Sequence, residues 1–460
     1  MSSSLATLVC AIGVLGLFFL ERDKSIHTSK ALWIPVIWLW INGSRPASMW
    51  LGMAPTNASA SQLLEGSPAD RMIFAILMAV GLVVLMFRLG RVAPLLRASW
   101  PILLYFAFCL LSVLWSDFPG VAFKRWTKAI GDLVMVLIVV TDARPIAALG
   151  RFITRAGFVL LPASILLIKY YGDLGRTYDK WSGEAANCGV STDKNMLGVT
   201  VFVLSLGACW LVLSLLRDKS QPNRVRHFLA RGTLLAFGLS LLVMAHSATS
   251  GACFALGAGM MLAAGSSVIG RRPAAVHALV LAILLIGSFT IFLGGHADIV
   301  HAMGRQTNLT GRTEIWEILI PMAPNWLIGA GYESFWLGPR LETMWSTFPG
   351  LYLNEAHNGY LETYLNLGWV GVGLIALILI HGYRRAVRAF RCDPTYGALL
   401  LAYVLTAAVY SITEAGFRLL DSIWMFLLLA IIAANGAAAD PKSGLAAFNA
   451  FDRTPIGLKS

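Results

Sequence analysis

The chain has 460 residues, of which 57% are hydrophobic and 13% charged, with a formal net charge of +12 and a mean hydropathy of +0.70. A soluble protein of this length could not bury so much apolar surface, so the surrounding solvent must be lipid. Apolar runs recur from one end of the chain to the other, which excludes a soluble domain on a single membrane anchor.

The chain begins with "MSSS", followed by the apolar run "LATLVCAIGVLGLFFL". No basic segment precedes this run and no small-residue cleavage site follows it. We therefore interpret it as a retained span rather than a signal peptide.

Runs able to cross about 30 Å of hydrocarbon predict about thirteen helical spans. Their approximate ranges are 4–20, 31–42, 72–88, 99–116, 127–141, 152–170, 196–216, 232–246, 251–269, 274–295, 367–381, 397–413 and 420–435. The short run 31–42 is either a span or a re-entrant or interfacial segment, which leaves about twelve spans in the second case. The predicted fold class is all-α: a polytopic integral membrane bundle forming a single domain over 1–435, with a tail at 436–460.

Basic clusters predict the orientation, because cytoplasmic loops carry an excess of Lys and Arg. Even numbers of predicted spans separate the clusters around Arg22, Arg88, Arg217–Arg231, Arg271 and Arg384–Arg391. These clusters and the tail are therefore expected in the cytoplasm, and thirteen spans would place the N-terminus outside. Long periplasmic loops are then expected at about 43–71, 171–195 and 296–366, the last of them partly helical.

Basic residues also remain at the predicted outer face. They include Arg125, Arg176, Lys180, Lys194, Arg305, Arg312, Arg340 and Arg418. One interpretation is a set of cations paired with nearby Asp and Glu. The other is an anion site at the outer membrane surface, most simply for a diphosphate.

Several expected signatures of other functions are missing. The sequence has no "GxxxxGK[ST]" motif, which argues against ATP-driven transport by this chain, and no "DxD" pair for a metal-bound nucleotide sugar. The cysteines do not indicate a disulfide framework, and the spacing of His296 and His301 suits a metal site poorly. We therefore expect no metal and no cofactor.

Charged residues deep inside spans would indicate an ion-coupled transporter. Asp132, Arg155 and Asp421 lie near predicted span ends, where side chains can reach the interface. A transporter is therefore disfavoured but stays as an alternative from another functional class.

The largest outer loop contains "RTEIWEILI", which predicts a short amphipathic helix entered through Gly311 and limited by Pro321. Arg312 falls in its first turn, where free N–H groups and the helix dipole favour an anion. The alternative for Arg312 is an ordinary surface cation.

The stretch "HNGYLETYLNLGWVGVG" predicts a helix that begins at His357 and Asn358 and continues as an apolar span. Tyr360 lies on the same helical face as His357, and the later glycines permit close approach of a neighbouring helix. Taken alone, a histidine at this position is more often a cap or interfacial residue than a catalytic one. The smaller loop places Arg176 and Lys194 beside aromatic residues, which suit sugar faces as well as membrane interfaces.

The spacing His357-Asn358, nine residues, Gly368, two residues, Gly371 resembles the signature of the O-antigen ligase and polymerase superfamily. "LTGRTEIWE…LIGAGYESF" resembles that family's large periplasmic loop, with Arg312 at the family's arginine. "TDKNMLG" before a span and "LWSDFPGVAFKR" resemble its exopolysaccharide polymerase branch. The resemblance covers roughly 80–435.

The resemblance implies a metal-independent membrane glycosyltransferase that takes a glycan from undecaprenyl diphosphate at the periplasmic face of the bacterial inner membrane. It implies that His357 is the base and Arg312 a catalytic clamp on the diphosphate. Arg176, Lys194 and Arg125 are expected to bind the diphosphate, and the secondary candidates are Asn358, Tyr360 and Arg418, with Glu414 as a further polar residue.

Three functional hypotheses remain. The first is a polymerase of lipid-linked repeat units into exopolysaccharide or O-antigen, and the second is a ligase that moves finished polymer to lipid A-core or another acceptor. The third is a transporter. The expected partners are the lipid-linked oligosaccharide, membrane lipid, a flippase and a chain-length regulator, and no nucleic acid.

Overall fold

A computed structural model describes residues 1–23, 27–53, 66–178, 185–218, 223–264, 277–278, 312–348 and 352–439. Its α-helices are α1 (Ser3–Glu21), α2 (Trp33–Asn42), α3 (Ala47–Trp50), α5 (Pro68–Met86), α6 (Leu89–Ala98), α7 (Trp100–Leu111), α8 (Pro119–Val140), α9 (Pro145–Tyr170), α10 (Gly172–Gly175), α11 (Lys194–Arg217), α12 (Arg224–Ala245), α13 (Ala248–Ala264), α16 (Arg312–Leu319), α17 (Pro339–Thr347), α18 (Gly359–Cys392), α19 (Pro394–Thr413) and α20 (Ser422–Ala439). Short 3₁₀ helices are η1 (Lys30–Leu32), η2 (Ser112–Trp115) and η4 (Ile320–Met322), and the strands β1 (Arg176–Tyr178) and β2 (Ala185–Asn187) pair antiparallel.

The all-α polytopic class is confirmed. Within the described residues, seven helices are long and apolar enough to cross a membrane, or eight if α6 and the helix after it, bent by 85°, form one span. α13 and α20 are shorter apolar helices. α8 has 22 residues but carries Lys124, Arg125, Lys128 and Asp132, which take it out of the apolar class.

The expected count of twelve or thirteen spans is higher than this. The predicted span 274–295 lies almost wholly outside the described residues. The predicted span 31–42 folds as α2, whose ten residues extend only about 15 Å. Because that length cannot cross the hydrocarbon layer, the re-entrant or interfacial alternative describes α2 better than a span does.

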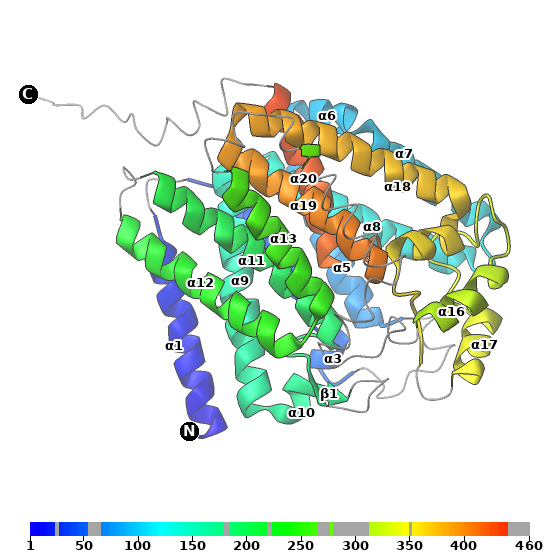
Figure 1. Cartoon of the computed structure of the whole chain (residues 1–460), viewed down its shortest axis with the longest axis horizontal. Coiled ribbons are helices and arrows are strands. Elements are labelled where there is room, and N and C mark those ends of the chain that lie inside the picture. The colour runs from blue at the N-terminus through cyan, green and yellow to red at the C-terminus, as the bar shows by residue number, and fades with distance from the viewer. Residues whose placement is uncertain are drawn as a thin grey trace, which may run out of the picture.

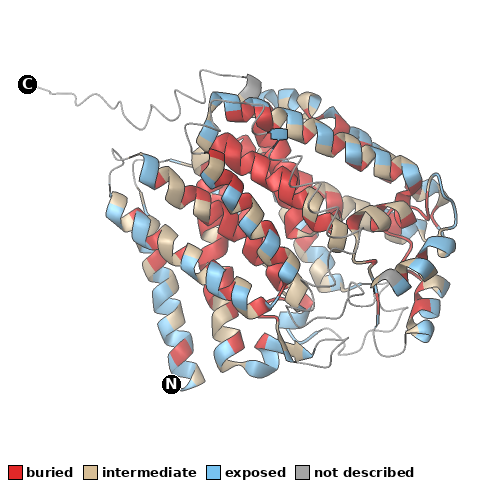
Figure 2. Cartoon of the chain, viewed as in Figure 1, coloured by how far each residue is buried: buried red, intermediate tan, exposed pale blue. Residues whose placement is uncertain are grey.

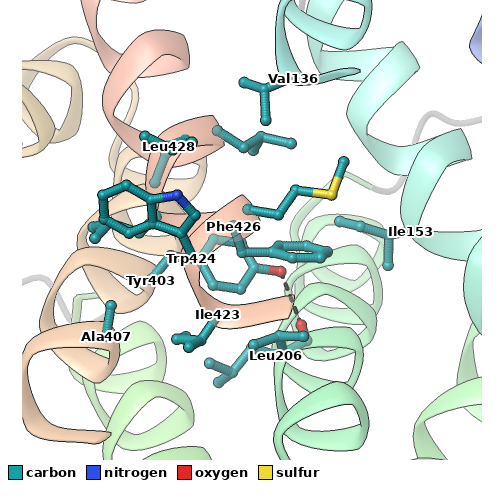
Figure 3. Packing of buried hydrophobic residues seen from close by; sticks show 14 of the residues in the cluster. Val136, Ile153, Leu206, Tyr403, Ala407, Ile423, Trp424, Phe426 and Leu428 are labelled. Atoms are coloured by element: carbon teal, nitrogen blue, oxygen red, sulfur yellow. Dashed lines mark hydrogen bonds between the residues drawn. The ribbon is translucent and has the colours of Figure 1, made fainter. Parts of the chain in front are cut away.

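The core lies where α8, α9, α11, α19 and α20 meet (Figure 2). Bulky rings fill it: Phe152 stacks on Phe426, and the buried Tyr403 hydroxyl donates to the carbonyl of Val203 over 3.0 Å. The rings of Tyr403 and Phe426 lie next to each other in this core (Figure 3). In contrast, only 11% of the α1 span is buried, and Leu8, Ile12 and Leu15 point outward. α1 therefore presents the apolar surface that lipid covers.

One buried charge differs from expectation. Asp132 is fully buried in α8, where its carboxylate accepts from the indole of Trp38 over 2.8 Å, from Asn42 over 3.4 Å and from the backbone N–H of Leu420 over 3.0 Å. The expectation that it reaches the interface was wrong, because its hydrogen-bond partners come from α2 and from the loop after α19. Arg155 also lies inside α9, with its guanidinium carbon 4.5 Å from the ring centre of Trp33.

The two ends of the bundle differ in the residues they gather. At one end, Thr7 near the start of α1 bonds the hydroxyl of Tyr171 over 2.8 Å, just before the β1–β2 hairpin (Figure 1). At the other end, Glu21 pairs with Arg231 over 2.8 Å, and Arg217 donates to Thr395 over 2.8 Å. The basic clusters that we assigned to the cytoplasm around Arg217–Arg231 therefore lie at the end opposite to the hairpin.

Candidate active site

Segments far apart in the sequence meet at the hairpin end of the bundle. They are the start of α16, the turn before α18, the loop after α19 and the start of α11. The charged cluster formed there comprises Arg312, Glu333, Glu355, His357, Glu414 and Arg418.

Glu414 lies at the centre of the charged cluster. Its Oε1 is 2.8 Å from Nη2 of Arg312, and its Oε2 is 3.3 Å from Nδ1 of His357. Asn195, at the start of α11, donates to Oε2 over 3.3 Å. The side chain of Glu414 is only 5% exposed, so these partners take the place of water around its charge.

His357 is held through one ring nitrogen. Its Nδ1 is 3.0 Å from Oε1 of Glu355 as well as 3.3 Å from Glu414, which leaves Nε2 for a substrate. The backbone of His357 has φ of +48°, a left-handed conformation that costs about 1–3 kcal/mol in a residue other than glycine. Such a conformation persists because its surroundings impose it.

The two carboxylates also decide the protonation state. Burial alone would lower the pKa of His357, but the charges and hydrogen bonds of Glu355 and Glu414 outweigh it and raise that pKa to about 10. The imidazole therefore carries a proton near neutral pH in this arrangement. The sequence interpretation of His357 as the base did not foresee these carboxylates.

Arg418 extends the charged cluster on the side of Glu355. Its Nη1 is 3.1 Å from Glu355 and its Nη2 is 3.7 Å from Glu333. Burial would raise the pKa of Glu355, but His357, Arg418 and Arg312 hold it well below its usual range. Positive and negative groups alternate along the cluster, which offsets the cost of burying each of them.

Hydrogen bonds to Ala356 fix the chain next to His357. The indole of Trp316 on α16 donates to the carbonyl of Ala356 over 2.7 Å, and the N–H of Ala356 donates to Glu362 over 2.9 Å. Glu362 also accepts from the indole of Trp336 over 2.7 Å. These bonds attach the helix that carries Arg312 to the turn that carries His357, so the glutamate of "HNGYLETY" is part of the scaffold.

α18 is broken at Gly368, which has φ of +63° and ψ of −165°. At the break, the N–H groups of Trp369 and Val370 donate to the carbonyls of Trp326 and Leu327 over 3.0 and 3.1 Å. A Cβ on Gly368 would lie 2.2 Å from the carbonyl carbon of Leu327. The first glycine of the signature therefore permits docking of the large loop, rather than the helix–helix approach expected from sequence.

The remaining candidates from the sequence fall into two groups. Asn358 caps α18 by accepting from the N–H groups of Tyr360 and Leu361 over 3.0 Å each, and the hydroxyl of Tyr360 donates to Ala408 over 3.0 Å. Both contacts stabilise the fold around His357. Arg125 on α8 donates to the carbonyl of Glu333, and this places it beside the charged cluster.

The smaller loop is held differently. Arg176 is the first residue of β1 and donates through Nε to the carbonyl of Ile168 over 3.2 Å, and no described contact joins it to the charged cluster. Lys194 begins α11, next to Asn195, which does contact Glu414. Arg176 and Lys194, the two residues of the smaller loop that were predicted to bind the diphosphate, thus lie at the same end of the bundle as the charged cluster. Of the two, Lys194 is directly adjacent in sequence to a residue that contacts the cluster.

Sequence reasoning missed Glu355, Glu333 and Asn195 and gave Glu414 little weight. Glu355 stands two residues before His357 in "LNEAHN", which is the one local signal available. Glu414, Glu333 and Asn195 reach the site only through folding.

A cation is one alternative occupant of this region. One ligand atom from each of Glu355, His357 and Glu414 lies within 4.8 Å of the others. The arginines bond the other oxygen of each carboxylate, Oε1 of Glu414 and Oε2 of Glu355, so a divalent ion would compete with the bonds between His357 and the two carboxylates rather than with the guanidinium groups.

The fold and the site define a class: a polytopic all-α membrane protein with a buried charged cluster at one end of its helical bundle. Residues 235–378, which include Arg312 and His357, match the sequence model of a family described as O-antigen ligase. The chain is also 26% identical over 288 residues to the exopolysaccharide production protein ExoQ of Rhizobium meliloti (strain 1021). That match covers 60% of this chain and 62% of the relative, so it spans about three fifths of each. Both matches confirm the resemblance to the O-antigen ligase and polymerase superfamily and its exopolysaccharide branch.

Proposed function

We propose that the chain is a membrane glycosyltransferase that transfers a glycan from a lipid-linked diphosphate to an acceptor hydroxyl. The observation that carries the proposal is that Glu414 holds both His357 and Arg312, which lie 45 residues apart in the sequence. The name of the relative, an exopolysaccharide production protein, and the family description support a reaction on polysaccharide.

In the proposed reaction, the acceptor oxygen attacks the anomeric carbon and forms the new glycosidic bond with inversion. The bond from that carbon to the diphosphate oxygen breaks, and the diphosphate leaves with the electron pair. Nε2 of His357 takes the proton of the hydroxyl. Arg312, with Arg176, Lys194 and Arg125 as further cations, stabilises the negative charge that develops on the leaving group.

The raised pKa of His357 gives this role a testable sign. Because only deprotonated imidazole accepts a proton, the rate should rise by about tenfold per pH unit below a pKa of about 10 and level off above it. If His357 instead acts as a cation on the diphosphate, activity should fall as the pH passes about 10. A pH profile of purified protein with lipid-linked oligosaccharide distinguishes the two roles.

Polymerisation of undecaprenyl-diphosphate-linked repeat units is the first form of this function, favoured by the exopolysaccharide relative. A ligase that transfers finished polymer is the second. Replacing His357 by Ala should abolish long polymer on the cell surface while the protein remains in the membrane. Accumulated single repeat units on the carrier would indicate a polymerase, and long polymer stranded on the carrier a ligase. Unchanged polymer length and yield would contradict the proposal.

The same proposal places the charged cluster at the periplasmic face of the inner membrane. Tyr178, 77% exposed on the hairpin, and the exposed Cys392 at the end of α18 offer a matched pair of labelling sites. A membrane-impermeant maleimide should label the variant Tyr178→Cys in intact cells, and should reach Cys392 only after the cells are opened. The opposite order would overturn the orientation.

A further inference from the structure

Glu414 contacts both functional side chains through separate oxygens. Oε1 faces Arg312 at 2.8 Å and Oε2 faces His357 at 3.3 Å. We propose that Glu414 is a positioning residue that fixes the diphosphate clamp and the proton acceptor relative to each other. This inference rests on the proposed function and deepens it, because it assigns one residue to the spacing between the arginine that holds the donor diphosphate and the imidazole that takes the proton of the acceptor hydroxyl.

The backbone around Glu414 is itself fixed. Glu414 is the C-cap residue that follows α19; its N–H donates to the carbonyl of Tyr410 over 3.0 Å, and its own carbonyl accepts from the N–H of Gly416 over 3.0 Å. The carbonyl of the preceding residue, Thr413, accepts a second bond from Arg312. Arg312 is therefore held by a backbone and a side-chain acceptor of one loop, and its remaining N–H groups keep a fixed direction for a phosphate.

Glu355 provides the comparison within the same cluster. It also contacts Nδ1 of His357, but its other oxygen bonds Arg418 rather than Arg312. Glu355 is 28% exposed, whereas Glu414 is 5% exposed. Both carboxylates hold the imidazole, but only Glu414 connects it to Arg312 among the contacts of the described residues.

This difference predicts separate effects on binding and on proton transfer. Without Glu414, Arg312 must be ordered by the ligand at the time of binding, which weakens affinity for a diphosphate. Without either carboxylate, the imidazole loses a negative neighbour, which shifts the rise in activity to lower pH. A residue that merely supports the fold would not change the pH of that rise.

The test uses the purified full-length chain in lipid nanodiscs with undecaprenyl diphosphate as the binding probe. Glu414→Gln should weaken binding of this probe by about tenfold, whereas Glu355→Gln should bind it as the wild type does. Both variants should move the rise in turnover of lipid-linked oligosaccharide to lower pH. Arg312→Ala serves as the positive control for lost binding. Equal binding by the Glu414 and Glu355 variants would overturn the inference.

A second variant covers the case in which Glu414→Gln does not fold. Glu414→Asp keeps the charge but withdraws the carboxylate by one methylene, so it cannot reach both partners. Weakened probe binding in folded Glu414→Asp supports the inference, and wild-type binding and turnover reject it. His357→Ala separates the two proposals: retained turnover rejects the proposed chemistry, whereas lost turnover with normal probe binding in Glu414→Gln rejects only the positioning role.

Discussion

The charged cluster and the β1–β2 hairpin both contain arginines that we expected to hold a diphosphate, but the fold treats these arginines differently. Arg312 and Arg418 are mostly buried and face carboxylates from other segments of the chain. Arg176 is exposed and donates to the carbonyl of Ile168, eight residues before it. Both regions lie at the hairpin end of the bundle (Figure 1). The charged cluster is assembled from segments far apart in the sequence, whereas Arg176 is held by a neighbouring part of the chain.

The difference in burial between these arginines indicates which of them can hold a ligand in one fixed orientation. A buried guanidinium fixed on two sides presents its remaining donors in one direction, which is what stabilisation of a developing charge requires. An exposed arginine acts mainly through its charge and is screened by water and salt. The cluster is therefore suited to the reacting diphosphate, and the hairpin to weaker attraction of anionic groups.

The largest expected effect concerns the type of cation. Arg312→Lys should lower the turnover of lipid-linked oligosaccharide by about 100-fold, because lysine cannot bond Glu414, Thr413 and a phosphate as a planar fork does. Arg176→Lys should change it by less than about threefold, since the charge is kept. An equal loss in both variants would remove the distinction between the two regions.

The next effect concerns the break in α18. Gly368→Ala should lower the free energy of unfolding by about 2–3 kcal/mol, because the added Cβ meets backbone atoms and the residue keeps a positive φ. Gly373→Ala is the matched control on the same helix, where a Cβ meets nothing within 4 Å. Thermal melting in detergent measures both. A stable Gly368→Ala variant would contradict the docking role of the break.

A smaller effect should follow from loosening the scaffold. Trp316→Phe removes the bond to the carbonyl of Ala356, which should cost about 1 kcal/mol of stability and lower turnover by about tenfold. Trp326→Phe, at a ring that is 65% exposed, should leave turnover unchanged. Similar turnover in the two variants would mean that the link from α16 to the turn before α18 does not position the site.

The smallest effect is expected from metal removal. EDTA should leave turnover unchanged, because the oxygens of Glu355 and Glu414 that a metal would need already bond Nδ1 of the protonated His357. Lost turnover that returns on adding a divalent cation would show instead that Glu355, His357 and Glu414 bind a metal.

The positions of the apolar helices could be predicted from the sequence because they depend on local hydropathy. A span of apolar residues must satisfy its backbone hydrogen bonds internally in lipid, so hydropathy alone located α1, α5, α11 and α19 to within about four residues at each end. The predicted spans 152–170, 232–246 and 367–381 fall on α9, α12 and α18 but miss the polar turns that lengthen these helices. The predicted span 127–141 falls on the second half of α8, whose first half carries charged residues and was not foreseen as helix. The predicted span 31–42 falls on α2, which is apolar but too short to cross.

The sequence by itself determined the all-α membrane class, the short helix that begins at Arg312 and the choice of His357 as a candidate functional residue, because these depend on local composition and spacing. Only the tertiary structure decided that Glu414, Glu355 and Arg418 surround the imidazole, that Asp132 is buried among α2 and the loop after α19, and that Gly368 breaks α18. Contacts between segments separated by tens to hundreds of residues leave no period in the sequence. They form because a charge taken out of water must find partners wherever the packed chain supplies them.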